Sequence, residues 1–127
     1  MTIYLNTNKP LENYKDLYRS KYFVDKSLLI QKLSEVIETS DKYVCVTRPR
    51  RFGKSSAIHM LAAYYSKETD SKHIFDNLNI SKSANYLEHL NKYNVINISF
   101  NEIPDNMKTY EDYINNRLCF KSVLILH

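Results

Sequence analysis

Residues 43–56 read YVCVTRPRRFGKSS, a short apolar run that passes directly into an arginine-rich loop. The β-branched and aromatic residues at 43–47 predict a buried strand. After the loop, apolar residues recur at helical spacing from Ala57 to Tyr65, which predicts a helix that begins near Lys54. Strand, tight loop and helix is the order that a phosphate-binding loop requires.

The end of this loop matches the pattern G-x-x-x-x-G-K-[ST] at Gly53, Lys54 and Ser55. In that pattern backbone N–H groups surround the phosphates, the lysine reaches the β- and γ-phosphates, and the hydroxyl ligates Mg²⁺. The N-terminus of the following helix also favours an anion. The chain contains one glycine, whereas average usage predicts about nine. Since that glycine is Gly53, its backbone freedom is expected to matter there.

The loop departs from the pattern at its first glycine, where Arg48 stands, followed by Pro49. Proline fixes its own φ and favours an extended residue before it, so the loop is expected to be stiff. Arg50 and Arg51 either form a solvated basic turn or contact phosphate, and the sequence leaves both open. Phe52 is expected to pack beneath the loop rather than stack on a base. A bare Gly-Lys-Ser can also be a simple turn and helix start. The candidate nucleotide-binding residues are Pro49, Arg50, Arg51, Phe52, Gly53, Lys54, Ser55 and Ser56; Ser55 is also the candidate metal ligand, and no residue is assigned a catalytic role.

The remaining pattern predicts an α/β fold. Residues 1–22 are expected to be an irregular lead-in with a short helix near 11–18, and Asp25 is expected to cap a helix over about 26–38. A strand is predicted at 94–100 and short helices on either side of it, the later one after a capping box at 109–112. Strands separated by helices favour a parallel sheet with flanking helices.

The last residues, Val123–Leu126, are consecutively apolar and are expected to form a buried strand or a packed helical turn. This ending suggests a domain truncated at the C-terminus. The expected organisation is therefore a lead-in at 1–22 and an incomplete phosphate-loop domain at 23–127.

Composition narrows the range of partners. The net charge is +4 and the isoelectric point is near 9.0, which favours anionic partners. The two cysteines and four histidines show no metal-ligand or disulfide spacing. No apolar stretch has the length of a signal peptide or a membrane span, so a soluble cytoplasmic protein without a membrane partner is expected.

Two segments together carry a resemblance to a known family: YFVDKS at residues 22–27 and VTRPRRFGKS at 46–55. The chain resembles the AAA-ATPase-like domain over about residues 14–114, a domain that commonly precedes a PD-(D/E)XK nuclease-like region. The resemblance implies a P-loop fold in which Lys54 binds phosphate and Ser55 holds magnesium, and that family's loop also lacks the first glycine. The acidic Walker B strand of the family has no counterpart here, so hydrolysis by this chain alone is not expected.

Binding of ATP with Mg²⁺ is therefore the leading hypothesis. One alternative is a basic nucleic-acid-binding module, in which the cationic loop contacts phosphates and the tyrosines stack on bases. Another is an inactive truncated remnant. The sequence does not identify a protein partner.

Overall fold

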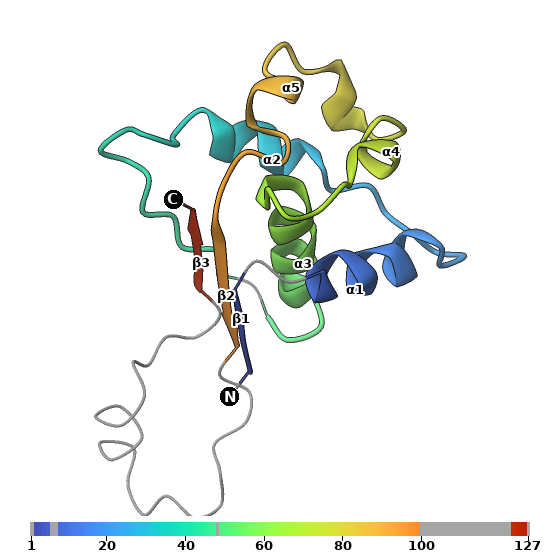
Figure 1. Cartoon of the computed structure of the whole chain (residues 1–127). Helices are drawn as coiled ribbons and strands as arrows, with labels where there is room; N and C mark the ends of the chain where they lie inside the picture. Colours follow the sequence, from blue (N-terminus) through green and yellow to red (C-terminus); the bar gives the residue numbers. More distant parts are fainter. Residues whose placement is uncertain (1, 6–7, 48, 100–122, 127) are drawn as a thin grey trace, which may run out of the picture.

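The computed structural model describes residues 2–5, 8–47, 49–99 and 123–126 (Figure 1). Arg48, at the position of the first glycine, lies outside these residues. So does the capping box predicted at 109–112, together with the helix expected after it. Those predictions stay untested.

Three strands form one sheet, in the order β1 (Thr2–Leu5), β2 (Val95–Ser99) and β3 (Val123–Leu126). Both pairings are antiparallel, and in their register Ile98 of β2 is paired with Ile3 of β1 and with Val123 of β3. Figure 1 shows β2 in the middle, with the two short strands along its edges. The strand predicted at 94–100 is confirmed over the five residues of β2, and the apolar C-terminal run is a strand.

The structure corrects two expectations about this sheet. The described strands pair antiparallel, so the parallel sheet is wrong for this part of the chain, where the one parallel pairing is the isolated bridge between Ser66 and Tyr93. Residues 43–47 form no strand, and Tyr43 is 87% exposed. Val44 and Val46 are each 51% exposed, so this run is not buried and pairs with none of the three strands.

The helices gather on one side of the sheet (Figure 1). Helix α3 begins at the predicted residue and packs along α1, and it also contacts β2 and β3. In the lead-in at 1–22, α1 confirms the short helix predicted near 11–18, whereas β1 stands where irregular chain was expected. The predicted helix at 26–38 is regular only over α2. The elements are α1 (Lys9–Tyr18), α2 (Leu28–Ser34), α3 (Lys54–Tyr65), α4 (Lys72–Phe75), the 3₁₀ turn η1 (Asn79–Lys82) and α5 (Tyr86–His89).

Aromatic rings fill the centre of the helical layer. Phe75 stacks on Tyr14 with 5.5 Å between ring centroids and meets Tyr64 edge-on at 5.2 Å. Buried tyrosines need partners for their hydroxyls. Tyr64 donates to the carbonyl of Tyr86 at 2.5 Å, and the Tyr65 hydroxyl lies 2.9 Å from Ser34 Oγ. Burial raises the pKa of Tyr65 to about 12, so its hydroxyl stays protonated.

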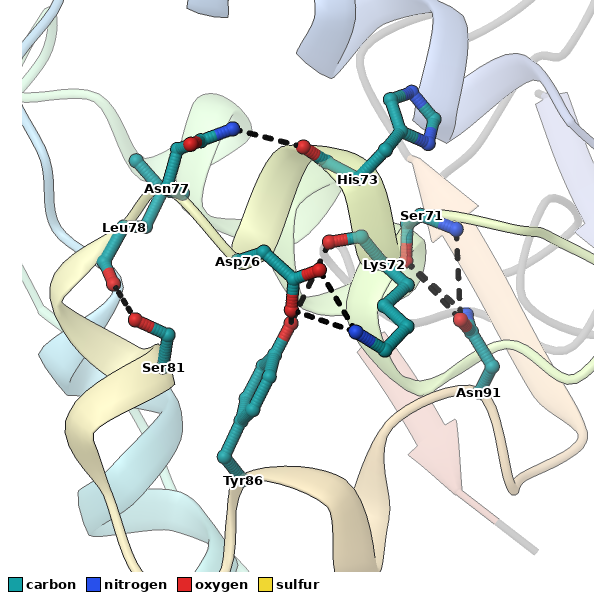
Figure 2. A network of polar contacts seen from close by, with 9 residues as sticks. All are labelled: Ser71, Lys72, His73, Asp76, Asn77, Leu78, Ser81, Tyr86 and Asn91. Atoms are coloured by element: carbon teal, nitrogen blue, oxygen red, sulfur yellow. Dashed lines mark hydrogen bonds and ion pairs between the residues drawn. The ribbon is translucent and has the colours of Figure 1, made fainter.

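The C-terminal end of α3 is closed by Asn91. Its side-chain nitrogen lies 2.9 Å from the carbonyl of Ser66 and 3.1 Å from Thr69 Oγ1, and its backbone N–H donates to the carbonyl of Tyr64 at 2.8 Å. Asn91 also contacts Ser71 on the opposite side of the turn (Figure 2). Its φ is +55°, a left-handed conformation that asparagine adopts more readily than most residues. The last carbonyls of the helix are thereby satisfied.

A second polar network joins α4 to α5 (Figure 2). The carboxylate of Asp76 accepts bonds from Lys72 Nζ at 2.8 Å and from the Tyr86 hydroxyl at 2.9 Å. These two bonds lower the pKa of Asp76. Since Tyr86 also receives the Tyr64 hydroxyl at its carbonyl, the network continues into α3.

We predict that Asn91→Ala lowers the free energy of unfolding by about 2–3 kcal/mol, because it leaves buried acceptors unsatisfied and places alanine in a left-handed conformation. Urea unfolding measures the change. Asn91→Gly is the matched variant, since it removes the amide without the backbone strain. A glycine variant as stable as the wild type would show that the amide contributes nothing.

Candidate functional site

The arginine-rich loop ends at Gly53, which is the N-cap of α3 in a left-handed conformation with φ of +78°. An L side chain is strained at this φ. A Cβ atom here would lie 2.6 Å from Lys26 Nζ, but that is the end of a flexible, exposed side chain that can move aside, so the positive φ is the reason for glycine. The first helical bond then forms from the N–H of Ala57 to the carbonyl of Gly53, at 2.9 Å. Glycine has no side chain to cover the first N–H groups of the helix, and this is the end that favours an anion.

Two lysines from different parts of the chain reach this loop. Lys54 Nζ donates to the carbonyl of Pro49 at 3.0 Å, so the side chain folds back over its own loop. Lys26 Nζ, from the segment before α2, donates to the carbonyl of Phe52 at 3.3 Å. Both side chains are exposed. The ammonium groups of Lys26 and Lys54 are therefore both bonded to backbone carbonyls of the loop, at Phe52 and Pro49.

The other predicted residues lie around these lysines. Arg50 and Arg51 are exposed, and Arg51 has a φ of +66°. Ser55 is exposed on the first turn of α3, and Ser56 is half-buried. Phe52 is 63% exposed, so the expectation that it packs beneath the loop is wrong. The loop is too short to fold its ring under a helix that begins two residues later.

Asp25 fixes the segment that carries Lys26. Its carboxylate accepts the backbone N–H groups of Ser27 and Asn79, both at 2.8 Å, and the hydroxyl of Ser27 accepts the N–H of Ile80 at 3.1 Å. Burial raises the pKa of Asp25, but the bonds from Ser27 and Asn79 outweigh it, and the pKa is lowered. Asp25 was expected to cap α2, whose N-cap is Ser27. It joins that helix to η1 instead.

A cleft of about 360 Å³ opens beside the loop. Its walls come from α1, the segment between α1 and α2, the loop at 51–53 and the first two turns of α3. Tyr14 and Phe23 supply aromatic surface, and Lys26 and Arg51 supply positive charge. The cleft thus shares residues with the candidate phosphate-binding loop.

The family model described as "Predicted AAA-ATPase" matches residues 10–124. The chain belongs to this family. No curated protein and no solved structure shows significant similarity to the chain. Membership in a predicted AAA-ATPase family supports a nucleotide-binding, ATPase-like domain. It also confirms the resemblance carried by residues 22–27 and 46–55.

Within this AAA-ATPase-like chain, none of the helices that the structure describes is long and apolar enough to cross a bilayer. The described residues also contain no group of three or more His, Cys, Asp or Glu side chains that could hold a metal ion. The residues at the loop fit a magnesium ion that arrives with its nucleotide. Mg²⁺ takes oxygen ligands and usually keeps several waters and phosphate oxygens, so one hydroxyl such as that of Ser55 can suffice.

Reasoning from the sequence did not place Lys26 and Tyr14 beside the candidate loop. Lys26 belongs to the YFVDKS segment that carries the family resemblance, but no binding role was predicted for it. Tyr14 lies in the short helix predicted near residues 11–18, which was not expected to approach the loop. Both reach the site only through packing of distant segments, and the periodicity of neighbouring residues gives no signal for that.

We predict that Asp25→Asn destabilises the fold by about 1 kcal/mol at neutral pH, because the variant loses the charge and one of two acceptor oxygens. The folded pKa of Asp25 lies below its usual 3.8. Its contribution is therefore complete above that pH and is lost as the pH falls through the folded pKa.

Urea unfolding at about pH 7 and about pH 3 should show the difference between wild type and Asp25→Asn shrinking in acid. Asp16→Asn, on an exposed position of α1, is the control. An Asp25→Asn variant as stable as the wild type at neutral pH would contradict the role of the carboxylate.

Proposed function

We propose that this chain binds Mg-ATP through the loop Pro49–Ser56, with Lys54 contacting the phosphates and Ser55 ligating magnesium. The observation that carries the proposal is the left-handed Gly53 cap, which presents an uncovered helix N-terminus directly beside two ammonium groups. Membership in the predicted AAA-ATPase family supports it independently.

The backbone of the loop suits an anion. Arg51 and Gly53 have positive φ, and Phe52 between them does not. Alternation of left- and right-handed residues turns successive N–H groups toward a common anion. Holding a non-glycine residue such as Arg51 in this region costs about 1–2 kcal/mol. Such strain is typical of residues that serve a ligand.

The two lysines already lie where phosphate charge would be neutralised. Each ammonium is bonded to a loop carbonyl, an uncharged acceptor. Bonds from lysine to a phosphate oxygen are charge-assisted and roughly twice as strong. Replacement of the Pro49 and Phe52 carbonyls by phosphate oxygens, as acceptors for the two ammonium groups, is therefore favourable.

We assign binding, and no hydrolytic step, to these residues. Magnesium, when bound with the nucleotide, would neutralise phosphate charge, and Ser55 would supply one of its oxygen ligands. None of the described loop residues is a carboxylate or imidazole that could act as a general base toward water.

We predict that Lys54→Ala weakens Mg-ATP binding by about 10- to 100-fold, because one charged hydrogen bond contributes about 1.5–3 kcal/mol. Calorimetric titration measures the affinity, after thermal melting has shown that both proteins unfold cooperatively. Lys32→Ala, at an exposed position of α2, is the matched control and should bind as the wild type does.

A well-folded wild type that binds no Mg-ATP would overturn the proposal. Equal affinity in wild type and Lys54→Ala would remove Lys54 from the site. If the chain instead bound single-stranded nucleic acid with steep salt dependence and no response to Mg²⁺, the basic surface would be the functional feature.

A further inference from the structure

The positive charge of the chain is concentrated in two segments, residues 19–26 and 49–54. Together they contain one carboxylate, that of Asp25, and six cations: Arg19, Lys21, Lys26, Arg50, Arg51 and Lys54. Of the 18 lysines and arginines and the 14 acidic residues of the chain, twelve and thirteen are left elsewhere. The two segments therefore carry +5 and the rest of the chain carries −1. Charge that is divided so unevenly indicates a surface for an anionic partner.

The fold brings these two segments together. Lys26 Nζ donates to the carbonyl of Phe52 at 3.3 Å, and Val24 and Lys26 line the same cleft as Arg51 and Phe52. All six cations are exposed. The carboxylate of Asp25 is already bonded to two backbone N–H groups, at 2.8 Å each. Residues 19–26 and 49–54 thus form one surface, called here the cationic surface.

Aromatic rings are exposed among these cations. Tyr22 is 84% exposed and Phe52 is 63% exposed. Lys21 Nζ lies 5.6 Å from the centroid of the Tyr22 ring, over one of its faces, and the high exposure of the ring leaves the other face open. In the loop, Arg51 directly precedes Phe52. Exposed rings beside cations suit single-stranded nucleic acid, because bases stack on the rings while phosphates bind the cations.

The cationic surface extends beyond what a single nucleotide needs. In the proposed function the phosphates of Mg-ATP lie at Lys54 and Ser55, at the start of α3. Arg19, Lys21 and Tyr22 belong to the other segment, and within the described part of the chain none of them lines the cleft. A polymer with repeated phosphates and bases would contact both segments, whereas one triphosphate would leave the first segment unused.

We propose that the cationic surface binds single-stranded nucleic acid, with phosphates at Lys21 and Arg50 and a base stacked on Tyr22. This inference goes beyond nucleotide binding and does not depend on it. An anionic membrane is the other large anionic partner. Helices that bind membranes present a continuous apolar face, whereas the rings here are interspersed with cations, which favours nucleic acid.

Tyr22→Ala is the decisive variant, and the exposure of this side chain makes a folding defect avoidable. Fluorescence anisotropy measures the binding of a labelled oligothymidylate of about 15 nucleotides at several salt concentrations. We expect the affinity of the wild type to fall steeply with salt. Tyr22→Ala should bind about 5- to 100-fold more weakly with the same salt dependence, and Tyr22→Phe, which keeps the ring, should bind as the wild type does.

Lys21→Ala tests the phosphate contact separately from stacking. It should reduce the slope of the logarithm of the affinity against the logarithm of the salt concentration by about 0.7, the effect of one phosphate contact on a single strand. Neither Lys21→Ala nor Tyr22→Ala should change the affinity for Mg-ATP, since both side chains lie outside the loop.

Lys42 and Tyr43 provide a matched control. Lys42 Nζ lies 5.6 Å from the centroid of the Tyr43 ring, and Tyr43 is 87% exposed, so the pair has nearly the same geometry outside the cationic surface. Lys42→Ala and Tyr43→Ala should bind the oligonucleotide as the wild type does.

Three results would overturn the inference. The first is a cooperatively folded wild type that does not bind the oligonucleotide; if it still binds Mg-ATP, the proposed function stands. The second is equal weakening by Tyr22→Ala and Tyr43→Ala, which would show attraction without a defined surface. The third is binding to phosphatidylcholine–phosphatidylserine vesicles and not to the oligonucleotide, which would make the cationic surface a membrane contact.

Discussion

The side-chain amide of Asn91 lies against the last carbonyls of α3, and the chain around it is bonded to the same end of the helix. The N–H of Tyr93 donates to the carbonyl of Tyr65, and the N–H of Lys67 donates back to the carbonyl of Tyr93, both at 2.9 Å. Two residues later the chain enters β2. The left-handed turn at Asn91 therefore sets where α3 ends and where the central strand begins. The position of the sheet relative to the helices depends on it.

The opposite end of α3 is arranged differently. Gly53 supplies the turn without a capping side chain, and the loop is held by the ammonium groups of Lys26 and Lys54. These bonds are exposed, so they contribute little stability and exchange easily. The segment carrying Lys26 is fixed more firmly, through Asp25 and its bonds to Ser27 and Asn79. The backbone that carries Lys26 is thus firmly bonded, whereas its ammonium group is exposed and is bonded only weakly to the carbonyl of Phe52.

Local pattern was sufficient to predict α3, β2 and the special role of Gly53, because each depends on residues within one turn or one strand. The same reasoning failed at residues 43–47. Their apolar character favours a strand, but pairing and burial depend on segments distant in the sequence, and the structure leaves Val44 and Val46 exposed. The pairing of β1 with β2 joins residues that are more than 90 positions apart. The bond from Lys26 to the loop, and the place of Tyr14 in the wall of the same cleft, likewise come from the packing of distant segments, which the spacing of apolar residues does not reveal.

Strained or unpaired groups occur at both ends of α3. The left-handed Arg51, the exposed ring of Phe52 and the unpaired hydroxyl of Tyr14 all lie at the loop and its cleft. At the other end, Asn91 is left-handed as well, and the buried Ser66 Oγ has no hydrogen-bond partner among the described residues. The cost of the left-handed backbone at Asn91 is offset by its bonds to the Ser66 carbonyl and to Ser71 (Figure 2). At the loop, the proposed phosphate would play the corresponding part for Arg51, because it would accept bonds from the backbone N–H groups that the turn presents.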